Sequence, residues 1–202
     1  MQVLPSRLAI ERVVSSLLDG GVVLIPTDTV YGLAALPTRP DAVARIYELK
    51  HRPRERRLPV IVEDAEQARA LGLEWPESAD RLAAAFWPGA LTIAVGVRTP
   101  AVDWLAGRDE VGLRAPASEL ALAIARATGP FLMTSANMSG QATHPALADV
   151  LASLDGSPDV AIDGGELGAV SSTLVNTNLP EPVIERQGAI PAADIEAVLA
   201  GA

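Results

Sequence analysis

The sequence predicts a single-domain α/β protein with a twisted, mixed sheet of about seven strands flanked by helices. Three observations support this fold class. Apolar runs of strand length alternate with amphipathic stretches, three late strands follow one another without helices between them, and no segment has the composition of a linker. Late strands without crossover helices favour a sheet that is not purely parallel. A length of 202 residues suits one domain spanning residues 1–202.

Seven amphipathic stretches predict helices. The first is capped by Ser6, carries Leu8, Val13 and Leu17 on its apolar face, and is closed by Gly20. The others are expected at residues 41–50, 64–71, 78–87, 118–128, 145–154 and 192–199. Short apolar runs bounded by turn residues predict the strands. They lie at residues 22–29 (cut short at Pro26), 58–63, 90–98, 110–116, 130–137, 159–163, 172–177 and 182–186.

The helix expected at 41–50 ends with the only lysine of the chain. Val43, Ile46, Tyr47 and Lys50 are spaced i, i+3, i+4 and i+7, which places Lys50 on the apolar face. We therefore expect its side chain to point toward the core side and away from bulk solvent.

The composition limits the chemistry. The 49% hydrophobic but only 3% aromatic residues predict an aliphatic core. The lack of cysteine excludes disulfides, thiolate nucleophiles and Cys-ligated zinc. No apolar run reaches the ~18–20 residues that span a bilayer, and "MQVLPSRLAIER" does not resemble a signal peptide. We expect a soluble cytoplasmic protein.

The charge is strongly acidic overall but basic at one place. A net charge of −9 disfavours tight non-specific binding to nucleic acid. Five of the sixteen Lys+Arg residues nevertheless fall between Lys50 and Arg57. A local cationic patch on an acidic body suits a compact polyanion such as a nucleoside triphosphate. A solvated arginine-rich loop is the alternative interpretation.

Polar motifs gather at the ends of the expected strands, where open α/β sheets bind ligands. They are "PTDTVYG" (26–32), "KHRP" (50–53), "GLRAP" (112–116), "TSANMSG" (134–140) and "SST" (171–173). The sequence has no P-loop, no G-x-G-x-x-G and no G-x-S-x-G elbow. We interpret His51 and His144 as non-catalytic, and two lone histidines make a poor metal site. What remains is a set of residues that position and neutralise phosphates, typical of an anion- or nucleotide-handling α/β enzyme.

Six motifs in order carry a resemblance to a known family. They are "PTDTVYGLA", Lys50-His51-Arg52-Pro53, "WPGALT", "VGLRAP", "TSANMSG", and "STLVN" followed by "ERQGAI". Over roughly residues 8–190 the chain closely resembles the YrdC-like family of L-threonylcarbamoyladenylate synthases. The resemblance implies a twisted α/β sheet around a basic concave cavity. It also implies condensation of L-threonine, bicarbonate or carbon dioxide, and ATP into threonylcarbamoyl-AMP, with release of pyrophosphate.

The resemblance also implies roles for individual residues. The catalytic pair would be Lys50 and Arg52, which hold the triphosphate and stabilise charge at the α-phosphorus. Further nucleotide contacts would come from Ser135, Asn137, Thr143 and Arg186. Threonine would be bound by Thr29, Arg114 and Ser172, with Tyr31 as a wall of the cavity. ATP would enter as a substrate with Mg²⁺ on its phosphates, without a protein metal site.

The expected partners follow from the same resemblance. A separate transferase complex would move the threonylcarbamoyl group to tRNAs that read ANN codons, with weak tRNA contact and no membrane association. The end at Ala202 resembles the short form of the family, and Glu63 stands where many relatives have a histidine near threonine. The roles of Arg54, Arg56 and Arg57 are open. Two other functions are weighed: a carbamoyl-adenylate enzyme of the hydrogenase-maturation type, and an RNA-binding, ribosome-maturation module.

Overall fold

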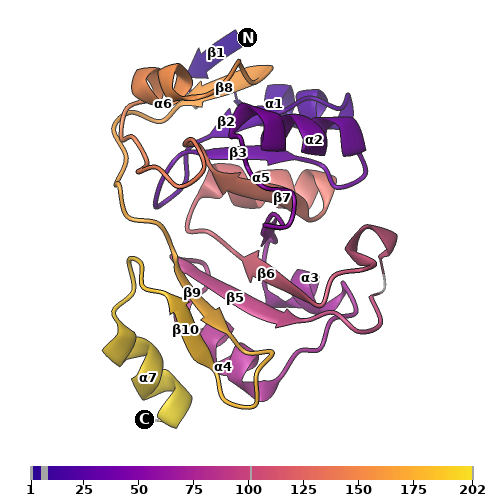
Figure 1. Ribbon diagram of the computed structural model, residues 1–202, viewed down its shortest axis with the longest axis vertical. Helices are drawn as coiled ribbons and strands as arrows, with labels where there is room; N and C mark the ends of the chain where they lie inside the picture. Colours follow the sequence, from indigo (N-terminus) through magenta and orange to yellow (C-terminus); the bar gives the residue numbers. More distant parts are fainter. Residues whose placement is uncertain (1, 6–8, 101, 202) are drawn as a thin grey trace.

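The computed structural model describes residues 2–5, 9–100 and 102–201, and these form one curved sheet with helices on both faces (Figure 1). Within those residues the sheet has ten strands in the order β1-β8-β2-β3-β7-β4-β6-β5-β9-β10. The strands are β1 (Gln2–Pro5), β2 (Val23–Ile25), β3 (Gly32–Ala35), β4 (Val60–Ile61), β5 (Leu91–Gly96), β6 (Glu110–Arg114), β7 (Phe131–Ser135), β8 (Val160–Asp163), β9 (Thr173–Asn176) and β10 (Val183–Arg186). The helices are α1 (Ala9–Leu18), α2 (Pro40–Leu49), α3 (Ala65–Arg69), α4 (Glu77–Phe86), α5 (Glu119–Thr128), α6 (Leu147–Ser153) and α7 (Ala192–Ala200), with a 3₁₀ turn, η2, at Asp103–Leu105.

The sheet is mixed, as expected. Parallel pairs join β1 to β8, β8 to β2, β4 to β6 and β5 to β9, whereas the remaining neighbours are antiparallel. The expected count of about seven strands was too low. The sequence did not predict β1, or β3, whose residues "GLAA" have low strand propensity and form a strand because β2 and β7 pair with them. That residues 1–202 form one domain stays a prediction.

All seven predicted helices are present at nearly the expected residues. Ser118 caps α5 by accepting a hydrogen bond from the backbone N–H of Ala121, and Asp64 caps α3 in the same way through Gln67. The predicted cap Ser6 and the expected apolar residue Leu8 lie outside the described residues. Among the residues described, no helix is long and apolar enough to cross a membrane.

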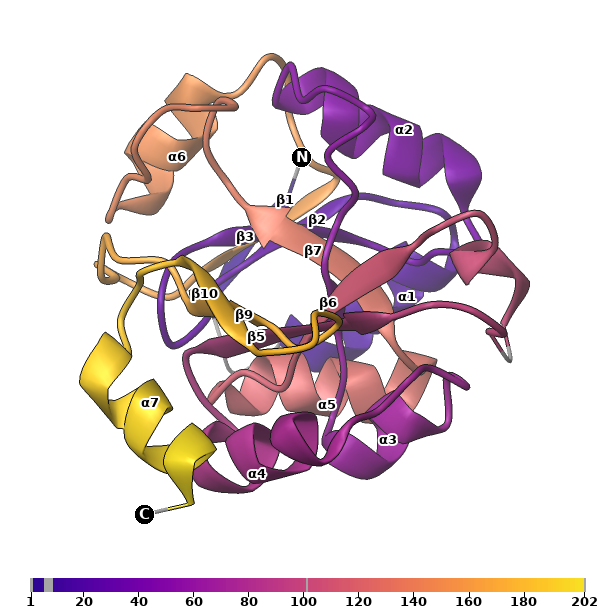
Figure 2. The same ribbon diagram turned by 60° about the horizontal axis from the view of Figure 1, so that its bottom comes forward.

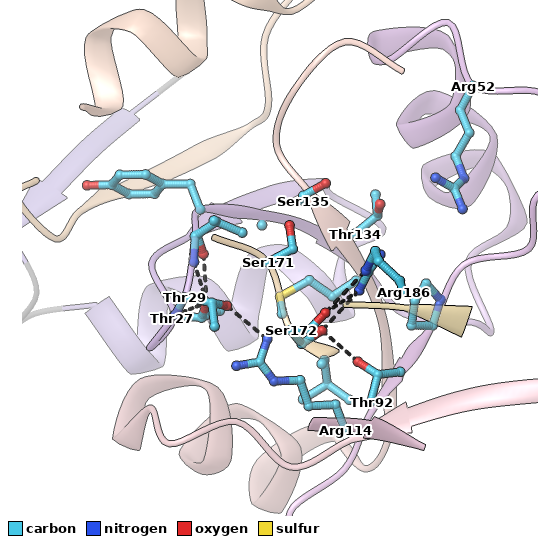
Figure 3. Close-up of a pocket in the computed structure, with 16 residues that line it drawn as sticks. Thr27, Thr29, Arg52, Thr92, Arg114, Thr134, Ser135, Ser171, Ser172 and Arg186 are labelled. Carbon is cyan, nitrogen blue, oxygen red and sulfur yellow. Dashed lines mark hydrogen bonds between the residues drawn. The ribbon is translucent and has the colours of Figure 1, made fainter. Parts of the chain in front are cut away.

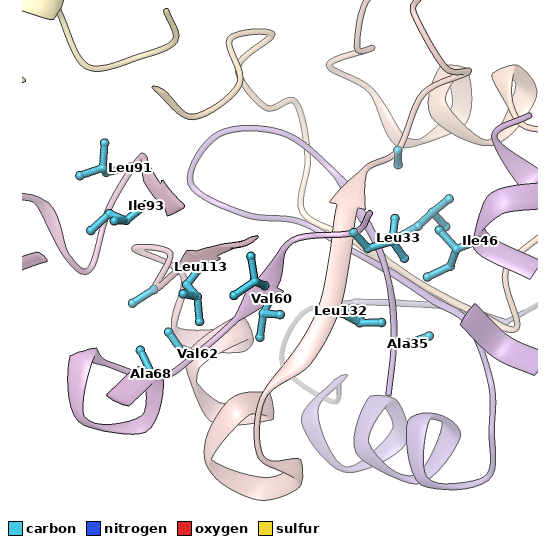
Figure 4. Packing of buried hydrophobic residues seen from close by; sticks show 14 of the residues in the cluster. Leu33, Ala35, Ile46, Val60, Val62, Ala68, Leu91, Ile93, Leu113 and Leu132 are labelled. Carbon is cyan, nitrogen blue, oxygen red and sulfur yellow. The ribbon is translucent and has the colours of Figure 1, made fainter. Parts of the chain in front are cut away.

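The core is divided between the two faces of the sheet because successive strand residues point to opposite sides. On one face Leu24 and Leu33 pack with Ile46 of α2, and Figure 4 shows this cluster extending past Leu132 and Val60 toward β5. The other face has Val23, Ile25 and Ala34, covered by apolar residues of α1 and α5. Both faces are therefore sealed by helices, and polar side chains gather where strands end.

The sheet is strongly curled, as the turned view in Figure 2 shows. In that view β3 and β7 lie on one side of a central region, and β5, β9 and β10 lie on the other. The first and last described strands, β1 and β10, are the two edges of the sheet. This curl brings residues from distant parts of the sequence together around one cavity.

Candidate active site

A polar cavity of about 130 Å³ lies among β3, β4, β5, β7 and β10 (Figure 3). Seven of the ten residues predicted to form the site line it: Thr29, Tyr31, Arg52, Arg114, Ser135, Ser172 and Arg186. Three of these seven are arginines, and the described residues that line the cavity include neither Asp nor Glu. The cavity is therefore basic although the chain carries a net charge of −9.

The loop between β2 and β3 forms one wall of the cavity, and Thr27 orders it. The Thr27 hydroxyl donates to the carbonyl of Val30 at 2.7 Å and accepts the backbone N–H groups of Thr29 and Val30. The two hydroxyls of Thr27 and Thr29 lie 3.1 Å apart. Because the proton of Thr27 is used by Val30, Thr29 is the donor in this pair. Its oxygen remains an acceptor at the cavity wall.

Arg114, at the end of β6, donates a hydrogen bond to this oxygen of Thr29. Its Nη1 donates to Thr29 Oγ1 at 2.9 Å, its Nε to the carbonyl of Gly89 at 2.8 Å, and its Nη2 to Asp28 Oδ1 at 2.7 Å. The side chain is 6% exposed. Burial lowers the pKa of Arg114, and Asp28 partly opposes this. Three partners in three directions hold the guanidinium at a fixed orientation.

The opposite wall contains Ser172 and Arg186. Ser172 Oγ lies 2.8 Å from Thr92 Oγ1, and Arg186 Nη2 donates to the carbonyl and hydroxyl of Ser172 at 2.9 and 3.1 Å. Burial lowers the pKa of Arg186. Ser172, directly before β9, thus supplies a hydroxyl, and the parallel pairing of β9 with β5 places this hydroxyl beside Thr92. Strand β10 supplies the cation of Arg186.

Lys50 lies at the C-terminus of α2 and points inward, as the helical spacing predicted. Its side chain is 1% exposed. Its Nζ donates to the carbonyl of Ser135 and to the carbonyl of Asn137 at 2.6 Å, with Asn137 Oδ1 at 3.5 Å. Burial, and then the Arg52 cation, lower the pKa of Lys50 to about 7. The ammonium therefore holds the loop after β7 and does not line the cavity.

The direction of the chain after α2 explains how Lys50 and Arg52 are separated. The backbone N–H of Arg52 bonds to the carbonyl of Tyr47 and that of His51 to Glu48, while His51 has a left-handed φ of 47°. This is a Schellman motif, with His51 where glycine is usual. Lys50 continues the buried helix face, whereas Arg52 turns toward the cavity.

Arg52 is held by the turn that follows it. Its Nε donates to the carbonyl of Arg56 at 2.8 Å and its Nη2 to that of Arg57 at 3.1 Å. Burial lowers the pKa of Arg52, and the cations of Arg56 and Arg186 act in the same direction. Arg52 and Arg186 both line the cavity, and an anion between them would relieve their repulsion.

Asn137 and Thr143 do not line the cavity. The Asn137 side chain accepts from Ser135 Oγ at 2.6 Å and donates to the carbonyls of Met138 and Gln141, so it shapes the loop. Thr143 donates to the carbonyl of Ala169 at 2.9 Å. Neither side chain therefore lines the cavity, although Asn137 contacts Ser135 and Lys50 beside it.

Tyr31 lines the cavity, but its hydroxyl is used elsewhere. It donates to the carbonyl of Gly165 at 2.7 Å and accepts from the backbone N–H of Gly164. Burial raises the pKa of Tyr31. Its ring is thus a fixed wall, and its hydroxyl ties the loop after β8 to the site.

Sequence reasoning missed several polar residues of the site. Thr27, Thr92, Thr134 and Ser171 line the cavity, and Asp28 pairs with Arg114. All five lie within motifs already singled out, but nothing in the motifs indicates which side chains point inward. Glu63 is directed away from the cavity, since its Oε1 accepts a bond of 2.7 Å from Arg126 Nε.

Comparison with known proteins places the cavity in context. A family model named for Sua5, YciO and YrdC and described as telomere recombination matches residues 15–188. A Bacillus subtilis protein named threonylcarbamoyl-AMP synthase is 39% identical over 194 residues, covering 94% of this chain and 56% of that protein. A Pyrococcus abyssi protein of the same name is 37% identical over 185 residues, covering 90% of this chain and 54% of that one. The chain thus spans about half the length of these relatives.

A solved structure shows the same fold. The crystal structure of Pyrococcus abyssi Sua5 complexed with L-threonine matches this chain with a TM-score of 0.87 at 34% identity, covering 98% of this chain and 60% of that one. The expected fold class is therefore confirmed.

Proposed function

Since this chain belongs to the Sua5/YciO/YrdC family, we propose that it condenses L-threonine, bicarbonate or carbon dioxide, and ATP into threonylcarbamoyl-AMP and pyrophosphate. The observation that carries the proposal is the cavity itself. It presents three arginines and several hydroxyls, with no carboxylate among the described residues that line it. Such a lining suits two anionic substrates, an amino acid carboxylate and a polyphosphate.

The threonine end of the site lies between two walls of the cavity. Thr29 and Arg114 belong to one wall, and Ser172 belongs to the other. Arg114 presents a planar fork that suits a carboxylate, and Asp28 now occupies part of it at 2.7 Å. We expect the substrate carboxylate to share or replace Asp28 on the guanidinium. The hydroxyls of Thr29 and Ser172 would then contact the amino group or the side-chain hydroxyl. The Tyr31 ring would limit the size of the side chain.

The nucleotide end is the side with Arg52, Ser135 and Arg186. The two guanidinium groups would grip the triphosphate, and Ser135 would contact the nucleotide beside them. Asn137 and Thr143 would take part only if their loops move, because neither lines the cavity. Direct contact of Lys50 with the triphosphate stays a prediction. Its present partners support a positioning role, in which it fixes the Ser135–Asn137 loop.

The reaction needs positioning and charge neutralisation more than proton transfer by a side chain. The threonine amine, after losing a proton, attacks carbon dioxide and forms a carbamate. A carbamate oxygen then attacks the α-phosphorus of ATP, the bond to the β-phosphate oxygen breaks, and pyrophosphate leaves. Negative charge grows on the phosphate oxygens, where Arg52 and Arg186 would stabilise it. Mg²⁺ would enter bound to ATP.

The cellular setting is proposed from the same relationship. The product would pass to a threonylcarbamoyl transferase complex that modifies tRNAs reading ANN codons, in the cytoplasm, with at most weak contact between this chain and tRNA.

The proposal is tested by pyrophosphate release and by mass spectrometry of the product. We expect threonylcarbamoyl-AMP only when threonine, bicarbonate, ATP and Mg²⁺ are all present. Arg52→Ala should abolish it, whereas Arg98→Ala, at a surface ion pair with Glu74, should not. Carbamoyl phosphate in place of threonine and bicarbonate tests the alternative carbamoyl-adenylate activity. Pyrophosphate release that does not require threonine would refute the proposal.

A further inference from the structure

A second cavity, of about 280 Å³, lies beside α2, between Tyr47 and the segment that carries Arg54 and Arg57. Leu132 of β7 lines this second cavity, Met133 and Thr134 line the first, and the two cavities share no lining residue. We call it the arginine groove, defined by Arg54, Arg57 and Arg108 together with Tyr47 and Trp104. Trp104, in the turn η2 on the loop between β5 and β6, lines the groove together with Val43 and Tyr47 of α2.

Among the residues that the structure describes, the three arginines of the groove have no carboxylate partner. Arg54 lies over the Tyr47 ring, with its Cζ 5.8 Å from the ring centre, and Arg108 Nη1 donates to the carbonyl of Leu58 at 3.1 Å. The Arg57 side chain makes no hydrogen bond or ion pair within residues 2–5, 9–100 and 102–201. Burial lowers the pKa of Arg108, and the Arg57 cation adds to this. Three like charges around one hollow favour an anion at their centre.

The groove also offers an aromatic surface with a free donor. Trp104 is half-buried, and Val43 and Leu132 provide apolar surface beside it. The indole N–H groups of Trp75 and Trp87 bond to Asp80 and to the carbonyl of Leu91. That of Trp104 has no hydrogen-bond partner in the part of the chain that the structure describes, and it is not buried away from solvent. An aromatic face with an unused donor suits a flat heterocycle.

We propose that the arginine groove is a second ligand site, which binds a nucleoside phosphate with its phosphate on the three guanidinium groups and its base on Trp104. The volume is close to the lower limit of ligand pockets, roughly 300 Å³, which suits one nucleotide and not a larger cofactor. The nucleotide is either free or part of a single-stranded RNA. This site does not depend on the proposed adenylate synthesis, because none of its residues lines the polar cavity.

The test uses the whole chain, AMP as probe and the indole ¹H–¹⁵N signals of the three tryptophans. AMP should shift the Trp104 signal, identified by its loss in Trp104→Leu, and leave those of Trp75 and Trp87 in place. Arg54→Ala/Arg57→Ala should weaken the effect of AMP on Trp104 at least about tenfold. The carbonyl of Arg57 that holds Arg52 is kept in this variant. The charge-matched control Arg98→Ala/Arg126→Ala, at exposed ion pairs elsewhere, should behave as wild type.

Two further probes define the ligand. Inorganic pyrophosphate should bind the groove more weakly than AMP. Followed by the backbone amide signals of Arg54 and Arg57, Trp104→Leu should weaken binding of AMP but not of pyrophosphate. A short single-stranded RNA that shifts the Trp104 signal at lower concentration than AMP identifies RNA as the source, and the reverse identifies a free nucleotide. A Trp104 signal that AMP leaves unchanged, or shifts equally in Arg54→Ala/Arg57→Ala, would overturn the proposal. Adenylate synthesis is assayed separately in every variant.

Discussion

Arg114 is the residue on which the proposed threonine end of the cavity depends. It is buried, and it donates to a carbonyl, a hydroxyl and a carboxylate in three directions. A lysine in the same place keeps the charge but loses the planar fork. Replacing Arg114 by lysine therefore tests whether the site needs the shape of the guanidinium or only its charge.

We predict that Arg114→Lys raises the KM for threonine by about 10- to 100-fold, because each charged hydrogen bond lost is worth ~1.5–3 kcal/mol. The KM for ATP should change much less, since Arg52 and Arg186 form the other end. Steady-state pyrophosphate release measures both. Arg98→Lys, at the surface, serves as the control, and an unchanged KM for threonine in Arg114→Lys would contradict the assignment.

Lys50 gives a second prediction at the same scale. The unfolded chain keeps the Lys50 proton up to about pH 10.5, whereas burial lowers the pKa of the folded side chain to about 7. Between these values the unfolded state binds more protons, so the free energy of unfolding rises with pH by up to ~1.4 kcal/mol per unit. The buried charge lowers the free energy of unfolding by its full amount below pH 7 and does not lower it above pH 10.5.

This pH dependence is measured by urea unfolding of wild type and Lys50→Met at about pH 6 and about pH 9. The wild type should gain stability relative to Lys50→Met as the pH rises. A difference that does not change with pH would show that the carbonyls of Ser135 and Asn137 keep the ammonium protonated in the folded state.

At the scale of elements, the end of α2 directs two cations to two places. The Schellman motif lets Lys50 complete the buried face and sends Arg52 toward the cavity. His51 adopts the left-handed conformation there and pairs with Asp155 at 2.5 Å. Both side chains of that pair are well exposed, so the pair contributes little stability.

We predict that His51→Gly is more stable than His51→Ala by about 1 kcal/mol, because only glycine adopts a φ of 47° without strain. Both variants lose the pair with Asp155, so their comparison isolates the backbone. Midpoints of urea unfolding give the difference. Equal stability, or a more stable His51→Ala, would mean that the helix end does not impose this conformation.

At the scale of the whole molecule, charge is distributed unevenly. The chain has a net charge of −9, yet Arg52, Arg114 and Arg186 meet at one cavity. They meet because β6 and β10 flank the pair β5–β9, and the turn after α2 brings Arg52 to the same cavity. The arginines of the cavity would therefore attract a triphosphate, although the net charge of the chain repels it.

We predict that the KM for ATP rises about five- to tenfold between about 50 and about 500 mM KCl, because salt screens the attraction of the cavity arginines. The KM for threonine, a zwitterion, should rise less. Arg186→Gln should flatten the dependence for ATP, while Arg98→Gln should keep it. A KM for ATP that is independent of salt would contradict an electrostatic role for these cations.

The sequence predicted much of the fold, because its signals are local. Helical spacing placed all seven helices and the inward direction of Lys50, and turn residues such as Pro26 marked where strands end. Strand β3 was missed because its residues "GLAA" have low strand propensity and form a strand only between β2 and β7. Local propensity does not contain that pairing.

The candidate site divides in the same way. By itself the sequence determined the mixed α/β class, the acidic body with one basic stretch, and the motifs that supply the site residues. Only the tertiary structure decided which side chains of those motifs meet. It placed Arg114 against Asp28 and Thr29. It also placed the Lys50 ammonium on the carbonyls of the distant loop after β7 and left Thr143 outside the cavity. The physical reason is that periodicity fixes the direction of a side chain within its own element, whereas its partners depend on strand order and on the curl of the sheet.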